Sequence, residues 1–339
     1  MSGIVSTMGP GLFSINDIVK AGMFGTNIFR LNLGKRDRDN IQYIDNWFKA
    51  KQILYTKNIN IEIMIDLPTS RPRIVDVINE EEIKLNKKVY LASERIFCDY
   101  PVIILSDLCC CVKDIAINDI ISFENKKMEL KIIEIDYVRG VICGKCIRKL
   151  DILTVSGAMG INGSAKFEIL TKTEREFLKN IAKQSIKIDY FALSFACRMH
   201  DIEYLENELL LFGFESSKIL LKIESYDGIR NVKNLLRKAS GIIIARGDLA
   251  INIKLSELYN VEKVLLAYSH ANNKICIMAT QLLEKYVLTD RLGYSEINDI
   301  MFAIREKADY LMLCGESSGQ LHPFDSIKIL KCLIESSKA

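Results

Sequence analysis

Eight short runs of apolar, largely β-branched residues recur along this chain, and they constrain its possible folds more than any other feature. The runs occupy residues 3–8, 27–33, 61–67, 190–195, 219–223, 241–245, 274–279 and 310–314. A strand that is buried on both faces has such a nearly continuous apolar sequence, which is typical of parallel sheets. The runs therefore predict eight buried strands in one parallel sheet.

The segments between these runs have the apolar spacing of amphipathic helices. In one of them, Ile229, Val232 and Leu236 recur so that they fall on one helical face. The other predicted helices cover residues 15–21, 40–55, 173–184, 202–211, 261–271, 296–307 and 324–336. Eight strand-then-helix units in series predict the α/β class and a (β/α)8 TIM barrel. An open doubly wound sheet is the alternative, although no glycine-rich dinucleotide fingerprint follows the first run.

One long interruption separates the third predicted strand from its helix. We interpret residues 74–167 as a small β-rich lid domain inserted after strand 3, and we assign residues 1–73 and 168–339 to the barrel. A lid of this kind could close over the catalytic face and exclude water. Within the interruption, strand-like stretches lie at residues 102–105, 120–123, 128–135 and 141–147.

Charge and composition argue against several classes of protein. The formal charge of +3 is not concentrated in any run of five or six basic residues, so we expect neither a nucleic-acid partner nor a membrane partner. No apolar run has transmembrane length and no secretory signal pattern begins the chain, so we expect a cytoplasmic protein with reduced thiols. The one Cys-x-x-Cys pair, Cys143 and Cys146, is more readily explained by packing than by a zinc or redox site.

Polar residues gather at the ends of six predicted strands. In barrel enzymes the working residues lie at the carboxyl ends of the strands. One charged residue at a strand end is usually solvated or salt-bridged, but the same pattern at six ends indicates a catalytic face. The residues at these ends are Arg30, Asn32, Asp66, Arg71, Arg73, Lys222, Glu224, Arg246, Asp248, Thr280, Gln281 and Glu316.

These residue types suit the transfer of a phosphoryl group. Lys222 and Glu224 are two positions apart, so their side chains should share one face. Glu224 and Asp248 follow neighbouring strands and could hold one divalent ion, because two carboxylates plus substrate oxygens and water suit Mg²⁺. Arg30, Arg73 and Lys222 offer positive charge to phosphates. Catalysis of phosphoryl transfer consists mainly of positioning and charge neutralisation, which such a set could supply.

At these residues the chain resembles the pyruvate kinase family. The motifs occur in the family's order and at its spacing, so the resemblance is specific over the barrel and weak over the insertion. They are the first strand and its turn at residues 3–10, Arg30-Leu31-Asn32, Lys222-Ile223-Glu224, Ala245-Arg246-Gly247-Asp248-Leu249, Ala279-Thr280-Gln281-Leu282-Leu283-Glu284 and Met312-Leu313-Cys314-Gly315-Glu316.

The resemblance implies an ATP-forming glycolytic enzyme that moves the phosphoryl group of phosphoenolpyruvate to ADP and releases pyruvate. It implies three catalytic residues. Lys222 would stabilise the phosphoryl group in flight, Thr280 would assist protonation of the enolate carbon, and Arg30 would contact the transferring phosphate.

The resemblance also implies the groups that bind substrate, metal and nucleotide. Backbone N–H groups near Gly247 would bind the substrate carboxylate, beside Asp248, Thr280 and Arg30. Glu224 and Asp248 would bind Mg²⁺ or Mn²⁺. The residues implied at the nucleotide are Arg73, Asn32 and Lys35.

Departures from the family pattern concern its K⁺ site. The family's serine is absent after Asn32, its threonine is replaced by Leu67, and its glutamate is replaced by Arg71. We therefore expect that K⁺ is not required. Asn32 and Asp66 would remain from the monovalent-cation site, and the Arg71 guanidinium would stand in for the ion.

Other departures concern assembly and regulation. The family's C-terminal regulatory domain has no counterpart in this sequence, so we expect no control by a sugar bisphosphate at that site. The family's Thr-Arg-Ala-Glu motif reads Gly293-Tyr294-Ser295-Glu296 and lacks its arginine. We expect a homodimer through the barrel helices or a hetero-oligomer with a full-length homologue. One alternative is a weak or inactive subunit that supports such a partner, and another is a lyase or aldolase barrel that uses phosphoenolpyruvate or pyruvate.

Overall fold

The computed structural model describes residues 2–35, 40–69, 72–123, 127–153, 159–162 and 169–337. The chain forms two compact units. The first contains Met1–Pro68, Lys172–Leu249 and Leu255–Ala339, and the second contains Thr69–Thr171 and Ala250–Lys254. Among the described residues, no helix is both long enough and apolar enough to cross a membrane.

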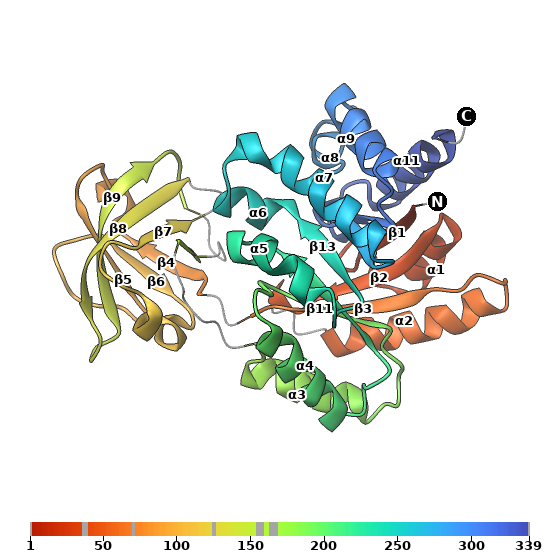
Figure 1. Ribbon diagram of the computed structural model, residues 1–339, viewed down its shortest axis with the longest axis horizontal. Helices are drawn as coiled ribbons and strands as arrows, with labels where there is room; N and C mark the ends of the chain where they lie inside the picture. Colours follow the sequence, from red (N-terminus) through yellow and green to blue (C-terminus); the bar gives the residue numbers. More distant parts are fainter. Residues whose placement is uncertain are drawn as a thin grey trace. The chain divides into compact units, whose positions relative to one another are not determined.

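The first unit is a closed barrel of eight parallel strands (Figure 1). Around the barrel the order is β1-β15-β14-β13-β12-β11-β3-β2, and pairing of β1 with β15 closes it. All eight predicted strands are present, so the predicted TIM barrel is confirmed and the open sheet was the wrong alternative. The strands are β1 (Gly3–Thr7), β2 (Thr26–Asn32), β3 (Glu62–Leu67), β11 (Tyr190–Leu193), β12 (Lys218–Ile223), β13 (Gly241–Ala245), β14 (Ile275–Ala279) and β15 (Tyr310–Leu313).

Side chains from every strand fill the interior of the barrel. Because the interior is packed rather than open, chemistry has to take place at an end of the barrel. This interior cluster consists of Val5, Ile28, Met64, Tyr190, Ala192, Leu220, Ile243, Ile277, Ala279 and Met312.

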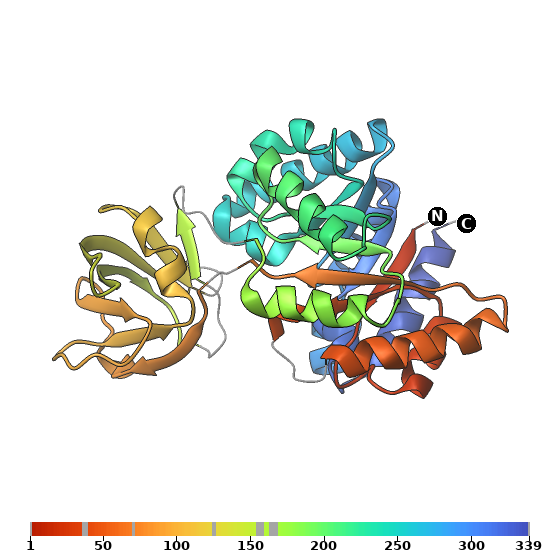
Figure 2. The same ribbon diagram turned by 90° about the horizontal axis from the view of Figure 1, so that it is seen from below.

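Helices cover the outside of the barrel (Figures 1 and 2). Their starts follow local chemistry: Ser14 and Asp17 form a reciprocal capping box at the first helix, and Pro323 occupies the first turn of the last. The long helices are α1 (Ile15–Met23), α2 (Asn40–Tyr55), α3 (Lys172–Ala182), α4 (Met199–Leu211), α5 (Tyr226–Leu235), α7 (Leu255–Ala271), α9 (Tyr294–Arg305) and α11 (Pro323–Ser336).

Three short helices after the last three barrel strands were not predicted from the sequence. They are α6 (Arg246–Asn252), α8 (Glu284–Thr289) and α10 (Gly315–Ser318). Each is too short to show helical periodicity, which is why the pattern of apolar residues does not reveal them. The start of α6 matters most, because Arg246 and Asp248 lie on this helix and not on the end of a strand.

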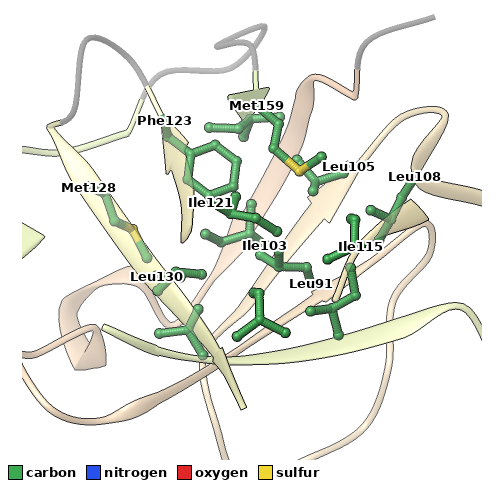
Figure 3. Close-up of a cluster of buried hydrophobic side chains, with 14 of the residues drawn as sticks. Leu91, Ile103, Leu105, Leu108, Ile115, Ile121, Phe123, Met128, Leu130 and Met159 are labelled. Atoms are coloured by element: carbon green, nitrogen blue, oxygen red, sulfur yellow. The ribbon is translucent and has the colours of Figure 1, made fainter. Parts of the chain in front are cut away.

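The second unit is a seven-stranded sheet in the order β10-β7-β8-β9-β5-β6-β4, which confirms the β-rich insertion. Its apolar core includes Ile103, Phe123 and Leu130 (Figure 3). Both Cys143 and Cys146 are buried thiols on β9, and Cys146 belongs to this core. The strands are β4 (Ile74–Ile78), β5 (Lys88–Ala92), β6 (Val102–Leu105), β7 (Ile120–Phe123), β8 (Met128–Asp136), β9 (Val141–Lys149) and β10 (Met159–Asn162).

Strands β4, β5 and β10 were not predicted. β4 and β10 form the two edges of the sheet. Only Ile74 is buried on β4, and β10 has only four residues. Edge strands are short and carry little apolar signal, so periodicity detects them poorly.

Candidate active site

Four charged side chains meet at the carboxyl ends of β2, β3 and β12, and we refer to Arg30, Asp66, Lys222 and Glu224 as the charged cluster. Arg30 donates from Nε and Nη2 to Asp66 Oδ2 at 2.9 and 2.7 Å. Lys222 Nζ lies 3.4 Å from Asp66 Oδ1 and 3.1 Å from Glu224 Oε1. The predicted shared face of Lys222 and Glu224 is present, and Asp66 joins Lys222 to Arg30.

Arg30, Asp66 and Glu224 are buried and the Lys222 side chain is only 14% exposed, and ion pairs outweigh the cost of burial at three of these four residues. Burial alone would raise the pKa of Asp66, but Lys222 and Arg30 lower it below its usual value. Burial alone would lower the pKa of Lys222, but Asp66 and Glu224 raise it. Burial likewise opposes the Arg30 charge, whose pKa Asp66 nevertheless raises. All three groups are therefore ionised at neutral pH.

Glu224 behaves differently from the rest of the charged cluster. Burial raises its pKa to about 7, Lys222 opposes that shift, and the charge of Asp248 adds to it. Its Oε2 accepts a hydrogen bond from the backbone N–H of Phe195 at 2.8 Å. Asp248 follows β13, in the first turn of α6. The charge of Asp248 disfavours ionisation of Glu224, and a divalent cation held by both carboxylates would offset this effect.

The Glu224 and Asp248 carboxylates suit Mg²⁺ or Mn²⁺ better than they suit a metal ion whose ligands all come from protein side chains. In the part of the chain that the structure describes, no three His, Cys, Asp or Glu side chains are grouped closely enough to hold an ion. Glu224 and Asp248 would thus supply two carboxylate oxygens and leave the other positions to substrate and water. Mg²⁺ commonly binds in this way, through one or two carboxylates together with phosphate oxygens.

Thr280 follows β14 in a turn whose backbone is uncommon for this residue type. Thr280 and Gln281 have φ angles of 71° and 56°. The Thr280 hydroxyl oxygen accepts a hydrogen bond from the backbone N–H of Gly247 at 3.0 Å. The N–H group that the family resemblance assigns to the substrate carboxylate is therefore bonded to Thr280 in this structure.

Two other polar residues from the predicted strand ends support the surrounding loops. Arg246 donates from Nη1 to both carboxylate oxygens of Asp299 on α9 at 2.6 Å. Glu316 accepts backbone N–H groups of Leu282 at 3.0 Å and of Cys314 at 2.8 Å. Their bonds thus brace the loops beside the charged cluster.

The residues expected at the nucleotide and K⁺ sites belong to both units of the chain. Asn32 is the register partner of Asp66, and its Oδ1 accepts the N–H of Gly34 at 3.0 Å. Lys35 ends a 3₁₀ turn (Leu33–Lys35), but its side chain lies outside the described residues, as does the whole of Arg71. Arg73 precedes β4 in the second unit, where its N–H donates to Ser106 Oγ at 3.3 Å.

Sequence reasoning missed two hydroxyl groups that complete the charged cluster. Ser194 Oγ accepts from Lys222 Nζ at 2.9 Å, and Thr7 Oγ1 accepts from Arg30 Nη1 at 2.9 Å. Thr7 is the last residue of β1 and Ser194 directly follows β11. The rule that directs attention to strand ends was applied to one hydroxyl residue, Thr280, but not to the ends of β1 and β11, where these two hydroxyl groups lie.

Comparison with known proteins places this barrel among named relatives. Residues 1–327 match the family model described as pyruvate kinase, barrel domain. Pyruvate kinase of Buchnera aphidicola subsp. Schizaphis graminum is 27% identical over 337 residues, which cover 96% of this chain and 67% of the relative. Pyruvate kinase of Thermotoga maritima is 27% identical over 331 residues, which cover 96% of this chain and 69% of that protein.

Solved structures agree on the fold. A pyruvate kinase from Cryptosporidium parvum superposes with a TM-score of 0.84 at 20% identity, over 99% of this chain and 69% of that one. A second structure of pyruvate kinase from that organism gives a TM-score of 0.82 at 21% identity. The chain spans about two thirds of the length of these proteins. It belongs to the pyruvate kinase family.

Proposed function

We propose that this protein transfers the phosphoryl group of phosphoenolpyruvate to ADP and thereby forms pyruvate and ATP in glycolysis. The observation that carries the proposal is the Lys222 ammonium, whose side chain is only 14% exposed and which is held between Asp66 and Glu224 at the carboxyl end of the barrel. A subunit without catalytic activity would have no need for a largely buried, ionised lysine of this kind, because a buried ion pair adds little net stability.

The charged cluster suits phosphoryl transfer because it can stabilise negative charge. The Lys222 ammonium would neutralise charge on the phosphoryl group as it moves between the two oxygens. Arg30, which Asp66 and Thr7 hold in place, would add positive charge on the substrate phosphate. Both groups are positioned before substrate arrives, so no reorganisation is needed during the reaction.

Glu224 and Asp248 would hold the divalent ion, Mg²⁺ or Mn²⁺. The bound ion supplies positive charge that neutralises phosphate oxygens. Without it, the three carboxylates Asp66, Glu224 and Asp248 outnumber the cations Arg30 and Lys222 when all are ionised. One divalent ion would make the site net positive, so we expect binding of phosphoenolpyruvate to depend on the metal.

Thr280 and Gly247 would act on the enolpyruvate part of the substrate. The substrate carboxylate would take the Gly247 N–H from the Thr280 hydroxyl. The released hydroxyl could then orient a solvent-derived proton toward the enolate carbon. The enolate π pair forms the new C–H bond, and the carbonyl of pyruvate is restored.

We also propose the finer assignments that follow from the family resemblance. Arg73, Asn32 and Lys35 would bind the nucleotide, and residues 74–167 would act as a lid on a barrel formed by residues 1–73 and 168–339. K⁺ would not be required, because Leu67 replaces the family's threonine and Arg71 would supply the positive charge. We place the protein in the cytoplasm, as a homodimer or with a full-length homologue, and not on nucleic acid or membranes.

The test is ATP formation by the purified protein from phosphoenolpyruvate and ADP with Mg²⁺ and without K⁺. Replacing Lys222 by Met removes the ammonium and should lower kcat at least about a hundredfold. Strong stimulation of the wild-type protein by added K⁺ would contradict only the K⁺ assignment. Absence of turnover in the wild-type protein would contradict the proposed function and favour the subunit that supports a partner.

A further inference from the structure

The Thr280 turn, which we define as residues 280–283, adopts a backbone that needs outside support. Two consecutive residues, Thr280 and Gln281, have φ angles in the left-handed region. Residues that carry a Cβ adopt this region rarely and at a cost in free energy. Such conformations persist where surrounding contacts over-determine them. The position of the Thr280 hydroxyl therefore depends on the groups that hold this turn.

Arg246 holds the beginning of the Thr280 turn. Its Nε donates to the carbonyl oxygen of Ala279 at 3.2 Å, and its Nη2 donates to the carbonyl oxygen of Thr280. Because the guanidinium is planar and rigid, two bonds to consecutive carbonyls fix their orientation. The next residue, Gly247, donates its N–H to the Thr280 hydroxyl. In the free protein the start of α6 thus fixes both the backbone and the side chain of Thr280, and the bonds from Arg246 to the backbone do not depend on the Gly247 N–H.

Glu316 holds the other end of the Thr280 turn. Its Oε1 accepts the backbone N–H groups of Leu282 at 3.0 Å and Leu283 at 3.3 Å. The Glu316 residue is only 3% exposed, so these bonds are protected from competing water. Arg246 is therefore one of two clamps on a strained turn, and it is the one that binds Thr280 itself.

A residue of the outer helical layer orients the Arg246 guanidinium. Both carboxylate oxygens of Asp299 on α9 accept hydrogen bonds from Arg246 Nη1. This contact orients the guanidinium so that its Nε and Nη2 groups face the Thr280 turn. Glu262 on α7 lies nearby and is 5% exposed. Burial raises the pKa of Glu262 to about 7, with Arg246 opposing the shift and Asp299 adding to it. Glu262 is only partly ionised near neutral pH, so Asp299 is the partner that orients Arg246.

We propose that Arg246, aimed by Asp299, is a positioning residue for the Thr280 hydroxyl. The inference rests on the proposed function, in which Thr280 assists protonation of the enolate carbon. Proton transfer requires the donor group within hydrogen-bond reach of its target. A displacement of about 1 Å can lower such a rate about a hundredfold. Arg246 acts through the carbonyls of residues 279 and 280, and Asp299 acts through Arg246.

Two substitutions weaken this clamp and leave Thr280 unchanged. Asp299→Asn keeps the size of the side chain and removes its charge, whereas Arg246→Lys keeps the charge and removes the planar fork. We expect each to slow exchange of the pyruvate methyl protons with solvent between about tenfold and a hundredfold. We expect kcat for ATP formation to fall with it, while KM for phosphoenolpyruvate changes less than about threefold, because the clamp acts on the protonation step.

Glu208→Gln is the matched control. It removes a carboxylate that faces Arg175 in the outer layer, between α3 and α4, and it should leave both rates unchanged. Thermal unfolding of all three variants tests whether each is folded at the assay temperature. Asp299→Asn, as the milder change, remains informative if Arg246→Lys fails to fold.

Amide hydrogen exchange of the free protein provides a readout that does not require turnover. We expect exchange at Gly247 and residues 280–283 to accelerate about tenfold in Asp299→Asn and Arg246→Lys but not in Glu208→Gln. Unchanged amide exchange would overturn the inference, and so would faster amide exchange accompanied by wild-type reaction rates. Accelerated amide exchange in a protein whose wild-type form has no turnover would overturn the proposed function and still support the clamp.

Discussion

At the scale of single residues, Asp66 is the group that makes the charged cluster possible. It is 1% exposed and bonds Arg30 while lying 3.4 Å from Lys222. Two cations would otherwise lie together in a buried site, where each would lower the other's pKa. The cationic site that a phosphate needs therefore depends on one carboxylate beneath it. This dependence can be measured as a loss of stability.

Replacing Asp66 by Asn should destabilise the barrel by about 3–5 kcal/mol, because it leaves the buried Arg30 without its counter-charge and leaves Lys222 with Glu224 alone. Trp47, the single tryptophan of the chain, is buried in the barrel unit and reports urea unfolding by its fluorescence. Asp325→Asn is the control, because Asp325 pairs with Lys328 and both side chains are 51% exposed, so it should cost only about 1 kcal/mol or less. Equal losses in both variants would contradict the role of Asp66.

The sequence predicted these residues unevenly, for physical reasons. Lys222 and Glu224 were predictable because alternation along a strand puts positions two apart on one face. Thr7 and Ser194 were not, because a hydroxyl at a strand end is common and gains meaning only from the charge it faces. The role of Arg246 was hidden because a helix begins at this residue, and its bonds to Ala279 and Asp299 join segments far apart in the sequence.

At the scale of elements, close approach of neighbouring strands sets the shape of the barrel. Gly241 begins β13 and is the register partner of both Leu220 on β12 and Ile275 on β14. A Cβ at this position would overlap the carbonyl oxygen of Ile275 and lie 2.7 Å from its Cβ. Glycine at this position therefore permits the strand spacing that carries residues 245–248 to the active site.

Gly241→Ala should consequently destabilise the barrel by about 1–3 kcal/mol, since the added methyl group overpacks a buried strand. Gly315→Ala is the matched control, because a Cβ there meets no atom within 4 Å and the position begins α10. Alanine at that helical position should be neutral or slightly stabilising. The comparison is made by urea unfolding at Trp47, and a Gly241→Ala variant as stable as Gly315→Ala would refute the packing argument.

At the scale of the whole molecule, two units with separate cores share one chain, and they were not equally predictable. The barrel strands form near-continuous apolar runs because both faces are buried. Four of the seven strands in the second unit were predicted, but the edge strands β4 and β10 and the inner strand β5 were not. The same eight-stranded barrel accommodates relatives that are only 20% identical, because apolar volume and periodicity fix this architecture more than individual residues do.

Binding of the divalent ion, binding of phosphoenolpyruvate and thermal stability should depend on one another in this protein. The reason is that the site has more carboxylates than cations until a divalent ion binds. We expect phosphoenolpyruvate to raise the Tm of the protein when Mg²⁺ is present, and Mg²⁺ or phosphoenolpyruvate alone to have little effect. A ligand at one hundred times its Kd stabilises the folded state by about 2.7 kcal/mol, which a thermal scan resolves. Glu224→Gln removes one proposed metal ligand and should abolish the shift. An equal shift with EDTA in place of Mg²⁺ would show that substrate binds without the metal, and it would contradict the metal assignment of Glu224 and Asp248.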